Sequence, residues 1–239
     1  AQLTHPSIVT VFDVGVDDGA CFIVSDYLVG ETLSERIARK TPDWQESAKI
    51  VALLAEALGF AHSRGIVHRD VKPANVIMTD RTGDLVPVLV DFGLALSESS
   101  IGRAGTRRGD ISGTPSYMSP EQARGEGHRI DGRTDIYSLG VIFYLMLSGE
   151  LPFSGKTVND LLAAVMHDDP RPPRQFVRGI PRDLERICLK AMARSLSERY
   201  TTARDFADDL STLLREHESE LQAAQAAARV PEQPTRGRE

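Results

Sequence analysis

The sequence carries its most reactive set of side chains in residues 68–75, which read His-Arg-Asp-Val-Lys-Pro-Ala-Asn. Sixteen residues later comes a second motif, Asp91-Phe92-Gly93. Between them the two motifs supply two carboxylates, one amide and one ammonium group, namely Asp70, Asp91, Asn75 and Lys72. Oxygen atoms of this kind bind Mg²⁺, and a cation stabilises negative charge that develops on phosphate. The spacing therefore indicates a site for a metal ion and a phosphorylated ligand.

The segment between the motifs should bring them together. Residues 76–79 and 86–90 are rich in apolar and β-branched side chains, and the turn-forming segment 80–84 separates them. Two strands joined by a tight turn reverse the chain, so we expect Asp70, Asn75 and Asp91 to converge on one cleft. Pro87 predicts that the second strand lies at an edge of its sheet or begins there.

The rest of the chain predicts strands first and helices later, which is an α+β arrangement with a dominant helical part. A hairpin is expected from 8–14 and 21–25 around Asp17-Asp18-Gly19. Helices are expected at 32–39, 43–63, 134–148, 157–167, 181–193 and 202–215. The helix at 134–148 is apolar after its first turn and should be central and buried. Residues 216–239 are expected to form a flexible linker.

Composition excludes several classes of protein. The chain has 239 residues, a net charge of −6, 41% hydrophobic and 26% charged residues, as expected for a globular protein. An acidic balance argues against nucleic acid as a partner. Two cysteines are too few for a disulfide framework and fit a reducing, cytoplasmic location. No apolar run is long enough for a membrane helix, and the six scattered histidines do not indicate a zinc site.

With these two motifs in order, the chain resembles the catalytic domain of a bacterial eukaryotic-like (Hanks-type) serine/threonine protein kinase. The resemblance implies that Asp70 is the base that orients the substrate hydroxyl. Asn75 and Asp91 would hold Mg²⁺ (or Mn²⁺), which bridges the ATP phosphates. Lys72 would touch the transferred phosphate, as in the Ser/Thr branch, and Arg69 implies regulation by phosphorylation of a loop.

Further motifs fit the same family in the same order. Ser112-Gly113-Thr114-Pro115 and Ser119-Pro120-Glu121 resemble the end of a kinase activation segment, in which Thr114 would hydrogen-bond the Asp70/Lys72 pair. Glu121 resembles the acid that pairs with a buried arginine, here Arg199. Asp135 resembles the acid at a helix start that holds the catalytic loop. These last three residues are expected to be structural.

The nucleotide should bind where the predicted hairpin ends. The resemblance implies that adenine bonds the carbonyl of Asp26 and the N–H of Leu28, with Ile77 as an apolar floor. Thr106, eight residues before Thr114, resembles an autophosphorylation site. Several serines in the same polar loop compete with it: Ser97, Ser99, Ser100 and Ser112.

Two kinase parts are missing from the sequence. There is no Gly-x-Gly-x-x-Gly, and the only lysines before Asp70 are Lys40 and Lys49, which follow the expected hinge. We therefore expect a truncated domain: residues 1–27 as the remnant of a small lobe, 28–215 as the large lobe and 216–239 as a tail. Such a fragment should transfer phosphate poorly, because it would lack half of the contacts that hold the ATP phosphates. Its hairpin should expose apolar surface and associate.

Three functions fit these observations. The first is an ATP-dependent Ser/Thr kinase acting on proteins, with dimerisation through the kinase domain as a further expectation. The second is a pseudokinase that serves as a scaffold, in which case the whole protein would lack this lysine and it would not have been removed by truncation. The third is a kinase for small molecules, which the segment 113–121 disfavours because it resembles a platform for protein substrates. A longer parent anchored in a membrane would carry this domain on the cytoplasmic side.

Overall fold

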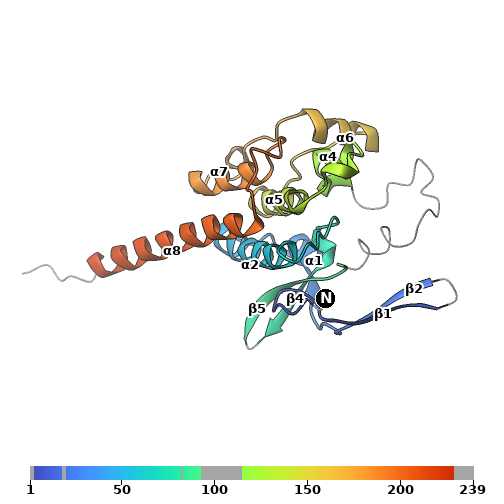
Figure 1. Ribbon diagram of the computed structural model, residues 1–239. Helices are drawn as coiled ribbons and strands as arrows, with labels where there is room; N and C mark the ends of the chain where they lie inside the picture. Colours follow the sequence, from blue (N-terminus) through green and yellow to red (C-terminus); the bar gives the residue numbers. More distant parts are fainter. Residues whose placement is uncertain (1–2, 18–19, 82, 93–114, 229–239) are drawn as a thin grey trace, which may run out of the picture.

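The computed structural model describes residues 3–17, 20–81, 83–92 and 115–228. Its strands gather at one end of the molecule, and its helices form the larger part (Figure 1). Strands β1 (Val11–Asp17) and β2 (Ala20–Ser25) make an antiparallel hairpin. Strands β3 (Glu31–Thr32), β4 (Val76–Arg81) and β5 (Asp84–Leu89) form a second, antiparallel sheet in the order β3-β4-β5. The predicted α+β class is confirmed.

The helices follow the order expected from the sequence, with one addition, the short helix α4. They are α1 (Leu33–Arg39), α2 (Trp44–His62), α4 (Pro120–Ala123), α5 (Gly132–Ser148), α6 (Val158–His167), α7 (Arg182–Ala191) and α8 (Ala203–Ala228). Short 3-10 turns are η1 (Pro73–Asn75), η2 (Pro115–Tyr117), η3 (Gly127–Arg129) and η4 (Pro173–Gln175). The expected boundaries are met within a few residues, except at the end of α8.

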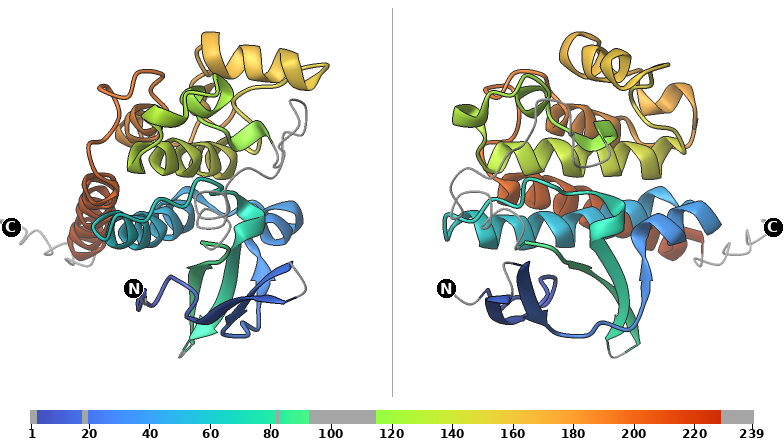
Figure 2. Two further views of the ribbon diagram at one scale, coloured as in Figure 1. Left: turned by 45° about the vertical axis from the view of Figure 1, so that its right-hand side comes forward. Right: turned by 90° about the vertical axis from the view of Figure 1, so that its right-hand side faces the viewer.

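The core lies where α2, α5 and α8 pack on one another (Figure 2). Helix α5 is buried along nearly its whole length, including the large side chains Tyr137, Phe143 and Tyr144. A helix that is apolar on all sides can be stable only when other elements surround it. The prediction of a buried central helix is thus confirmed.

Side-chain caps fix the starts of α1 and α2. Thr32 and Glu35 form a full capping box, in which each side chain accepts a hydrogen bond from the other residue's backbone N–H. At α2 only half of such a box forms: Asp43 accepts from the N–H of Glu46 at 2.8 Å. The Glu46 carboxylate instead pairs with Arg36, so it ties α1 to α2.

The structure corrects the prediction of a linker that begins at residue 216, because α8 continues through Ala228. Residues 216–228 are therefore helical. The reason lies in their composition, which is dominated by Ala, Glu and Gln with high helix propensity and contains neither Gly nor Pro. Residues 229–239 lie outside the described part of the chain.

The β1–β2 hairpin exposes apolar side chains, as expected. Phe12, Val14 and Val16 are 59%, 59% and 65% exposed, and Ile23 opposite Val14 is 40% exposed. A two-stranded sheet with uncovered apolar residues is unstable in water unless another surface covers it.

Among the described helices, none is both long and apolar enough to cross a membrane.

We expect residues 1–239 to self-associate through this hairpin as their concentration rises. Replacing Val14 and Val16 by lysine should reduce association, because the added charges oppose burial of that face. Sedimentation velocity across a concentration series measures the effect, with the exposed Val158→Lys on α6 as the control. If the double variant associates as strongly as the control, the hairpin is not the contact.

Candidate active site

The loop between α2 and η1 is held by one buried carboxylate. Asp135, in the first turn of α5, is fully buried. Its Oδ2 accepts a hydrogen bond from the N–H of His68 at 2.8 Å, and its Oδ1 accepts from the N–H of Arg69 at 2.7 Å. A third donor is His62, whose Nε2 lies 2.7 Å from Oδ2 and must carry a proton because a carboxylate only accepts.

His62 itself is held in place by a close approach of the backbone. A Cβ atom at Gly132 would lie 2.6 Å from Nδ1 of His62, which is closer than such atoms can come. Glycine therefore lets the start of α5 approach the ring, so that the ring reaches Asp135. Two of the three donors belong to the loop, so Asp135 fixes the segment that leads to Asp70.

Asp70, Lys72 and Asn75 form one hydrogen-bonded cluster. Lys72 Nζ donates to Asp70 Oδ2 at 2.7 Å, and Asn75 Nδ2 donates to the same oxygen at 3.2 Å and to the Asp70 backbone carbonyl at 2.9 Å. The side chain of Asp70 is 40% exposed, whereas Asn75 is 5% exposed. Among the described residues, no hydrogen bond uses Oδ1 of Asp70.

His68 brings the second motif to this cluster. Its Nδ1 accepts from the N–H of Asp70 at 3.3 Å, and its Nε2 lies 2.9 Å from the carbonyl oxygen of Val90, to which it donates. Its ring packs on Phe92, with ring centroids 4.6 Å apart. The N–H of Val90 also donates to the carbonyl of Asn75 at 3.0 Å. Asp91, the next residue, therefore lies in the same neighbourhood as Asp70 and Asn75.

Two residues here have left-handed backbone conformations. Arg69 has a φ angle of 69° and Asp91 has a φ angle of 64°, and they are the only non-glycine residues with positive φ in the described ranges. Such conformations cost free energy and persist only where the surroundings hold them. Both strained residues lie beside the cluster of Asp70, Lys72 and Asn75. Backbone strain of this kind is concentrated at active sites.

The donor set suits a hard cation that is shared with phosphate. Asn75 and Asp91 offer an amide oxygen and an exposed carboxylate. Within the described ranges, no three His, Cys, Asp or Glu side chains gather as a metal site of their own. Mg²⁺ typically takes one or two protein oxygens and completes its shell with phosphate and water. The residues present therefore fit Mg²⁺ bound together with a nucleotide.

The expected adenine contacts lie in the irregular segment after β2. The N–H of Asp26 donates to the carbonyl of Thr10 at 3.0 Å, which orients the segment. No backbone hydrogen bond within the described chain uses the N–H of Leu28, so it is open to a ligand. Ile77 is half-buried in β4. Gly30 allows the chain after β2 to pass close to β4, because a Cβ atom at this position would lie 2.1 Å from the carbonyl oxygen of Met78.

A buried ion pair fixes α4 to the helical core. Both terminal nitrogens of Arg199 donate to Glu121, at 2.8 Å each, and both side chains are at most 2% exposed. Thr134 Oγ1 donates to Glu121 at 2.9 Å, and Arg199 also donates to the carbonyl oxygens of Ala193 and Arg133. The pair is therefore fully hydrogen-bonded, which such a buried pair requires.

The charge of Arg199 sets the ionisation of Glu121. Burial alone would raise the pKa of this carboxyl, but the hydrogen bonds and positive charge of Arg199 outweigh burial, and the pKa lies below its ordinary value of 4.5. The carboxylate form is thus the one that the folded protein stabilises.

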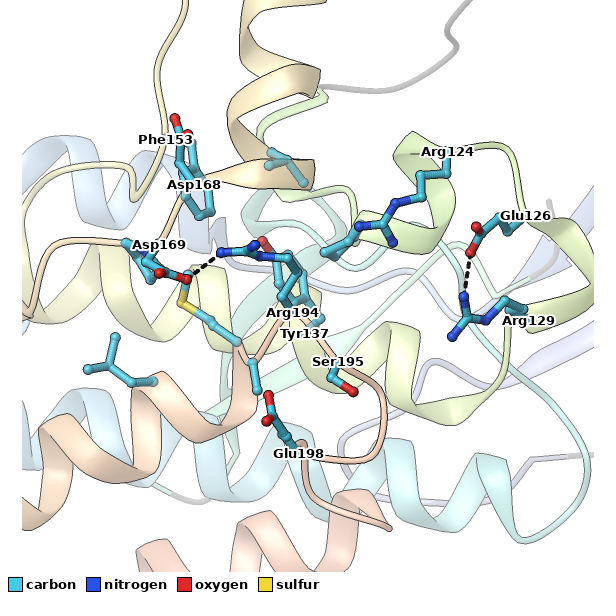
Figure 3. Close-up of a pocket in the computed structure, with 16 residues that line it drawn as sticks. Arg124, Glu126, Arg129, Tyr137, Phe153, Asp168, Asp169, Arg194, Ser195 and Glu198 are labelled. Atoms are coloured by element: carbon cyan, nitrogen blue, oxygen red, sulfur yellow. Dashed lines mark hydrogen bonds and ion pairs between the residues drawn. The ribbon is translucent and has the colours of Figure 1, made fainter.

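Two expected site residues, Thr114 and Thr106, lie outside the described residues, as do the competing serines at 97, 99, 100 and 112. A cavity of about 780 Å³ lies behind α4, and it contains none of the expected site residues (Figure 3). Its wall includes the ion pairs Arg194–Asp169 and Arg129–Glu126, at 2.5 and 3.0 Å. It is separate from the Asp70 cluster.

Sequence reasoning missed several contacts. His62 supports Asp135 and His68 joins the two motifs, and nothing in the sequence indicates these partners. Gln122 was not singled out, yet its Nε2 donates to the carbonyl of Arg69 at 2.7 Å. The pattern Ser119-x-x-Gln122 does predict a helix cap. Nothing local predicts a contact between residues 53 positions apart.

We expect Asp135→Asn to lower the free energy of unfolding by at least about 2 kcal/mol, because an amide cannot accept from all three donors and buried N–H groups are left unpaired. Urea unfolding of residues 1–239 measures this. Asp84→Asn, at an exposed position, is the control. Equal stability of the two variants would contradict the role of Asp135 as the anchor of the loop.

The Glu121–Arg199 pair should make stability depend on pH. Because the folded pKa of Glu121 lies below its unfolded value of about 4.5, the pair contributes fully above that pH and its contribution is lost as pH falls through the folded pKa. Urea unfolding between pH 7 and pH 3 should show a steeper acid loss for the wild type than for Glu121→Gln, which takes up no proton there. At pH 7, Glu121→Gln should cost about 3–5 kcal/mol. Parallel pH profiles would contradict this.

Comparisons with known proteins identify the family. The protein kinase domain family matches residues 1–212. The serine/threonine-protein kinase PknB of Mycobacterium tuberculosis is 37% identical over 215 residues, which are 88% of this chain and 34% of PknB. The serine/threonine-protein kinase pkn3 of Myxococcus xanthus is 37% identical over 224 residues, which are 90% of this chain and 40% of pkn3. The chain thus spans about a third of the length of these relatives.

A solved structure shares the fold. The kinase domain of PknI from Mycobacterium tuberculosis superposes with a TM-score of 0.66 at 31% identity, covering 88% of this chain and 73% of that chain. The family model matches nearly the whole chain, and the relatives and the shared fold point to the same family. The chain belongs to the protein kinase family, in its bacterial Hanks-type branch.

Proposed function

We propose that the chain forms the catalytic centre of a Ser/Thr protein kinase, which transfers the γ-phosphate of ATP to hydroxyl groups of proteins. The observation that carries this proposal is the cluster of Asp70, Lys72 and Asn75 beside Asp91. A structural loop has no need for an exposed carboxylate bonded to both an ammonium group and an amide. The names of the relatives support the same activity.

Each residue of the cluster has a distinct task. Asp70 Oδ1 accepts a hydrogen bond from the substrate hydroxyl and aims its oxygen at the phosphorus. Lys72 and Asn75 hold Asp70 Oδ2, so that the other oxygen faces the substrate. Lys72 also places a positive charge where the transferred phosphoryl group carries negative charge.

Nucleotide binding is assigned to residues of this cluster, to Asp91 and to the segment that follows β2. Asn75 and Asp91 hold Mg²⁺, which neutralises phosphate charge when it is bound. The carbonyl of Asp26 and the N–H of Leu28 bond adenine, and Ile77 packs beneath the ring. Lys72 contacts the terminal phosphate.

Regulation is assigned to Arg69 and Thr106. Arg69 is exposed, and no described ion pair involves its guanidinium group, which can hold a phosphate with two hydrogen bonds. We propose that autophosphorylation of Thr106 provides this phosphate and that it orders the segment around the substrate site.

The proposed activity of residues 1–239 alone is low. Their sequence has no glycine-rich loop and no strand lysine to hold the α- and β-phosphates. Phosphoryl transfer depends on positioning and on electrostatic stabilisation, so the loss of these contacts weakens it strongly. A scaffold without activity is the alternative that this absence favours.

The test is phosphate transfer from labelled ATP to a Ser/Thr peptide library by the protein as its gene encodes it. Asp70→Asn should lower kcat by about 10²–10⁴-fold, because the hydroxyl loses its hydrogen-bond acceptor. The exposed Asp84→Asn should leave kcat unchanged. No transfer by the wild type, with ATP still bound, would favour the scaffold.

The same assay on residues 1–239 alone should show little transfer. Strong Mg²⁺-dependent transfer by this chain, abolished by Asp70→Asn, would contradict the proposal that it lacks half of the contacts that hold the ATP phosphates. Such a result would still support the kinase assignment itself.

A further inference from the structure

Gln122, in the short helix α4, uses both ends of its side-chain amide. Its Oε1 accepts from the backbone N–H of Ser119 at 3.0 Å and from Ser119 Oγ at 3.2 Å, which caps α4. Its Nε2 donates to the backbone carbonyl of Arg69 at 2.7 Å. One side chain therefore joins α4 to the loop that carries Asp70.

The carbonyl that Gln122 holds belongs to a strained residue. Arg69 has a φ angle of 69°, and its N–H is bonded to Asp135 Oδ1 at 2.7 Å. Asp135 on α5 thus holds the nitrogen of Arg69, and Gln122 on α4 holds its carbonyl oxygen. Two bonds from two different elements keep this backbone in a conformation that it would otherwise leave.

The position of that carbonyl bears directly on Asp70. The carbonyl of Arg69 and the N–H of Asp70 lie in one planar peptide group. Rotation of this plane would turn the backbone at Asp70 and move its carboxylate. The N–H on the other side of the plane makes only a long bond, of 3.3 Å, to His68 Nδ1. The bond from Gln122 is therefore the shorter of the two that orient the plane.

Helix α4 is a rigid point from which to hold the loop. On one side of Gln122, Glu121 is fixed by Arg199 through two bonds of 2.8 Å. On the other side, Arg124 Nη2 donates to the carbonyl of Met166, at the end of α6, at 3.2 Å. Figure 3 shows Arg124 projecting from α4 beside the cavity behind it. Gln122 thus lies between two anchors.

We propose that Gln122 is a positioning residue for phosphoryl transfer: it sets the orientation of the Asp70 carboxylate by holding the carbonyl of Arg69. The proposal rests on the proposed kinase function. It assigns no contact between Gln122 and substrate. Its effect acts through the peptide plane that precedes Asp70.

Two substitutions separate the two bonds of Gln122. Gln122→Glu keeps an oxygen for the Ser119 cap but replaces the donor to Arg69 by an acceptor. Gln122→Lys keeps a donor for Arg69 but removes the acceptor for Ser119. Asp160→Asn alters the capping box of α6, away from the loop, and is the matched control for loss of a cap. All are made in the protein as its gene encodes it.

We expect Gln122→Glu to lower kcat by about 10- to 100-fold, because small misplacements of a reacting group cost that much. The KM for ATP should stay within about twofold, because the side chain of Gln122 bonds Ser119 and Arg69 and not the residues proposed to bind adenine. Gln122→Lys and Asp160→Asn should keep kcat near that of the wild type. If kcat falls with Gln122→Lys and not with Gln122→Glu, only the cap matters and the proposal is overturned.

A second readout does not depend on activity. Amide hydrogen exchange in residues 66–72, measured by mass spectrometry, should be at least about tenfold faster in Gln122→Glu than in Gln122→Lys, because the strained backbone is released. Equal exchange in the two variants would overturn the proposal. Absence of transfer by the wild type would defeat the proposed function, and the exchange rates would still decide whether Gln122 holds the loop.

Discussion

The loop that carries Asp70 depends on a carboxyl group that has no access to water. Three donors surround the buried Asp135 side chain: the backbone N–H groups of His68 and Arg69 and the ring of His62. Without them, a buried charge would cost several kcal/mol. The dependence is mutual, since the loop has a strained backbone that relaxes without an acceptor. The position of Asp70 is therefore coupled to the burial of the first turn of α5.

The same helix anchors a second polar network. Glu121 receives a bond from Thr134, the neighbour of Asp135, and its partner Arg199 bonds the carbonyl of Arg133. The start of α5 thus supports both the loop before Asp70 and helix α4. Buried ion pairs add little net stability compared with apolar packing, so their value here is geometric. They fix the elements on either side of the site relative to one another.

Local sequence predicted the elements well and the contacts between them poorly. The hairpins, α2 and the buried α5 follow from periodicity, caps and turn residues. The end of α8 differs from the prediction, because the high helix propensity of Ala, Glu and Gln extends the helix through Ala228. The cluster of Asp70, Lys72 and Asn75 is local and could be expected from spacing. The bridge through His68 to Val90 and the bond from Gln122 to Arg69 join distant segments, so they depend on the tertiary fold.

The contact between Gly132 and His62 has a consequence for sequence variation. A methyl group at position 132 would displace the imidazole that supports Asp135. A residue with no functional group of its own thereby helps to position an ionisable one. Any larger residue at position 132 must move the His62 ring, although the position lies at a helix start where most residue types are ordinarily accepted.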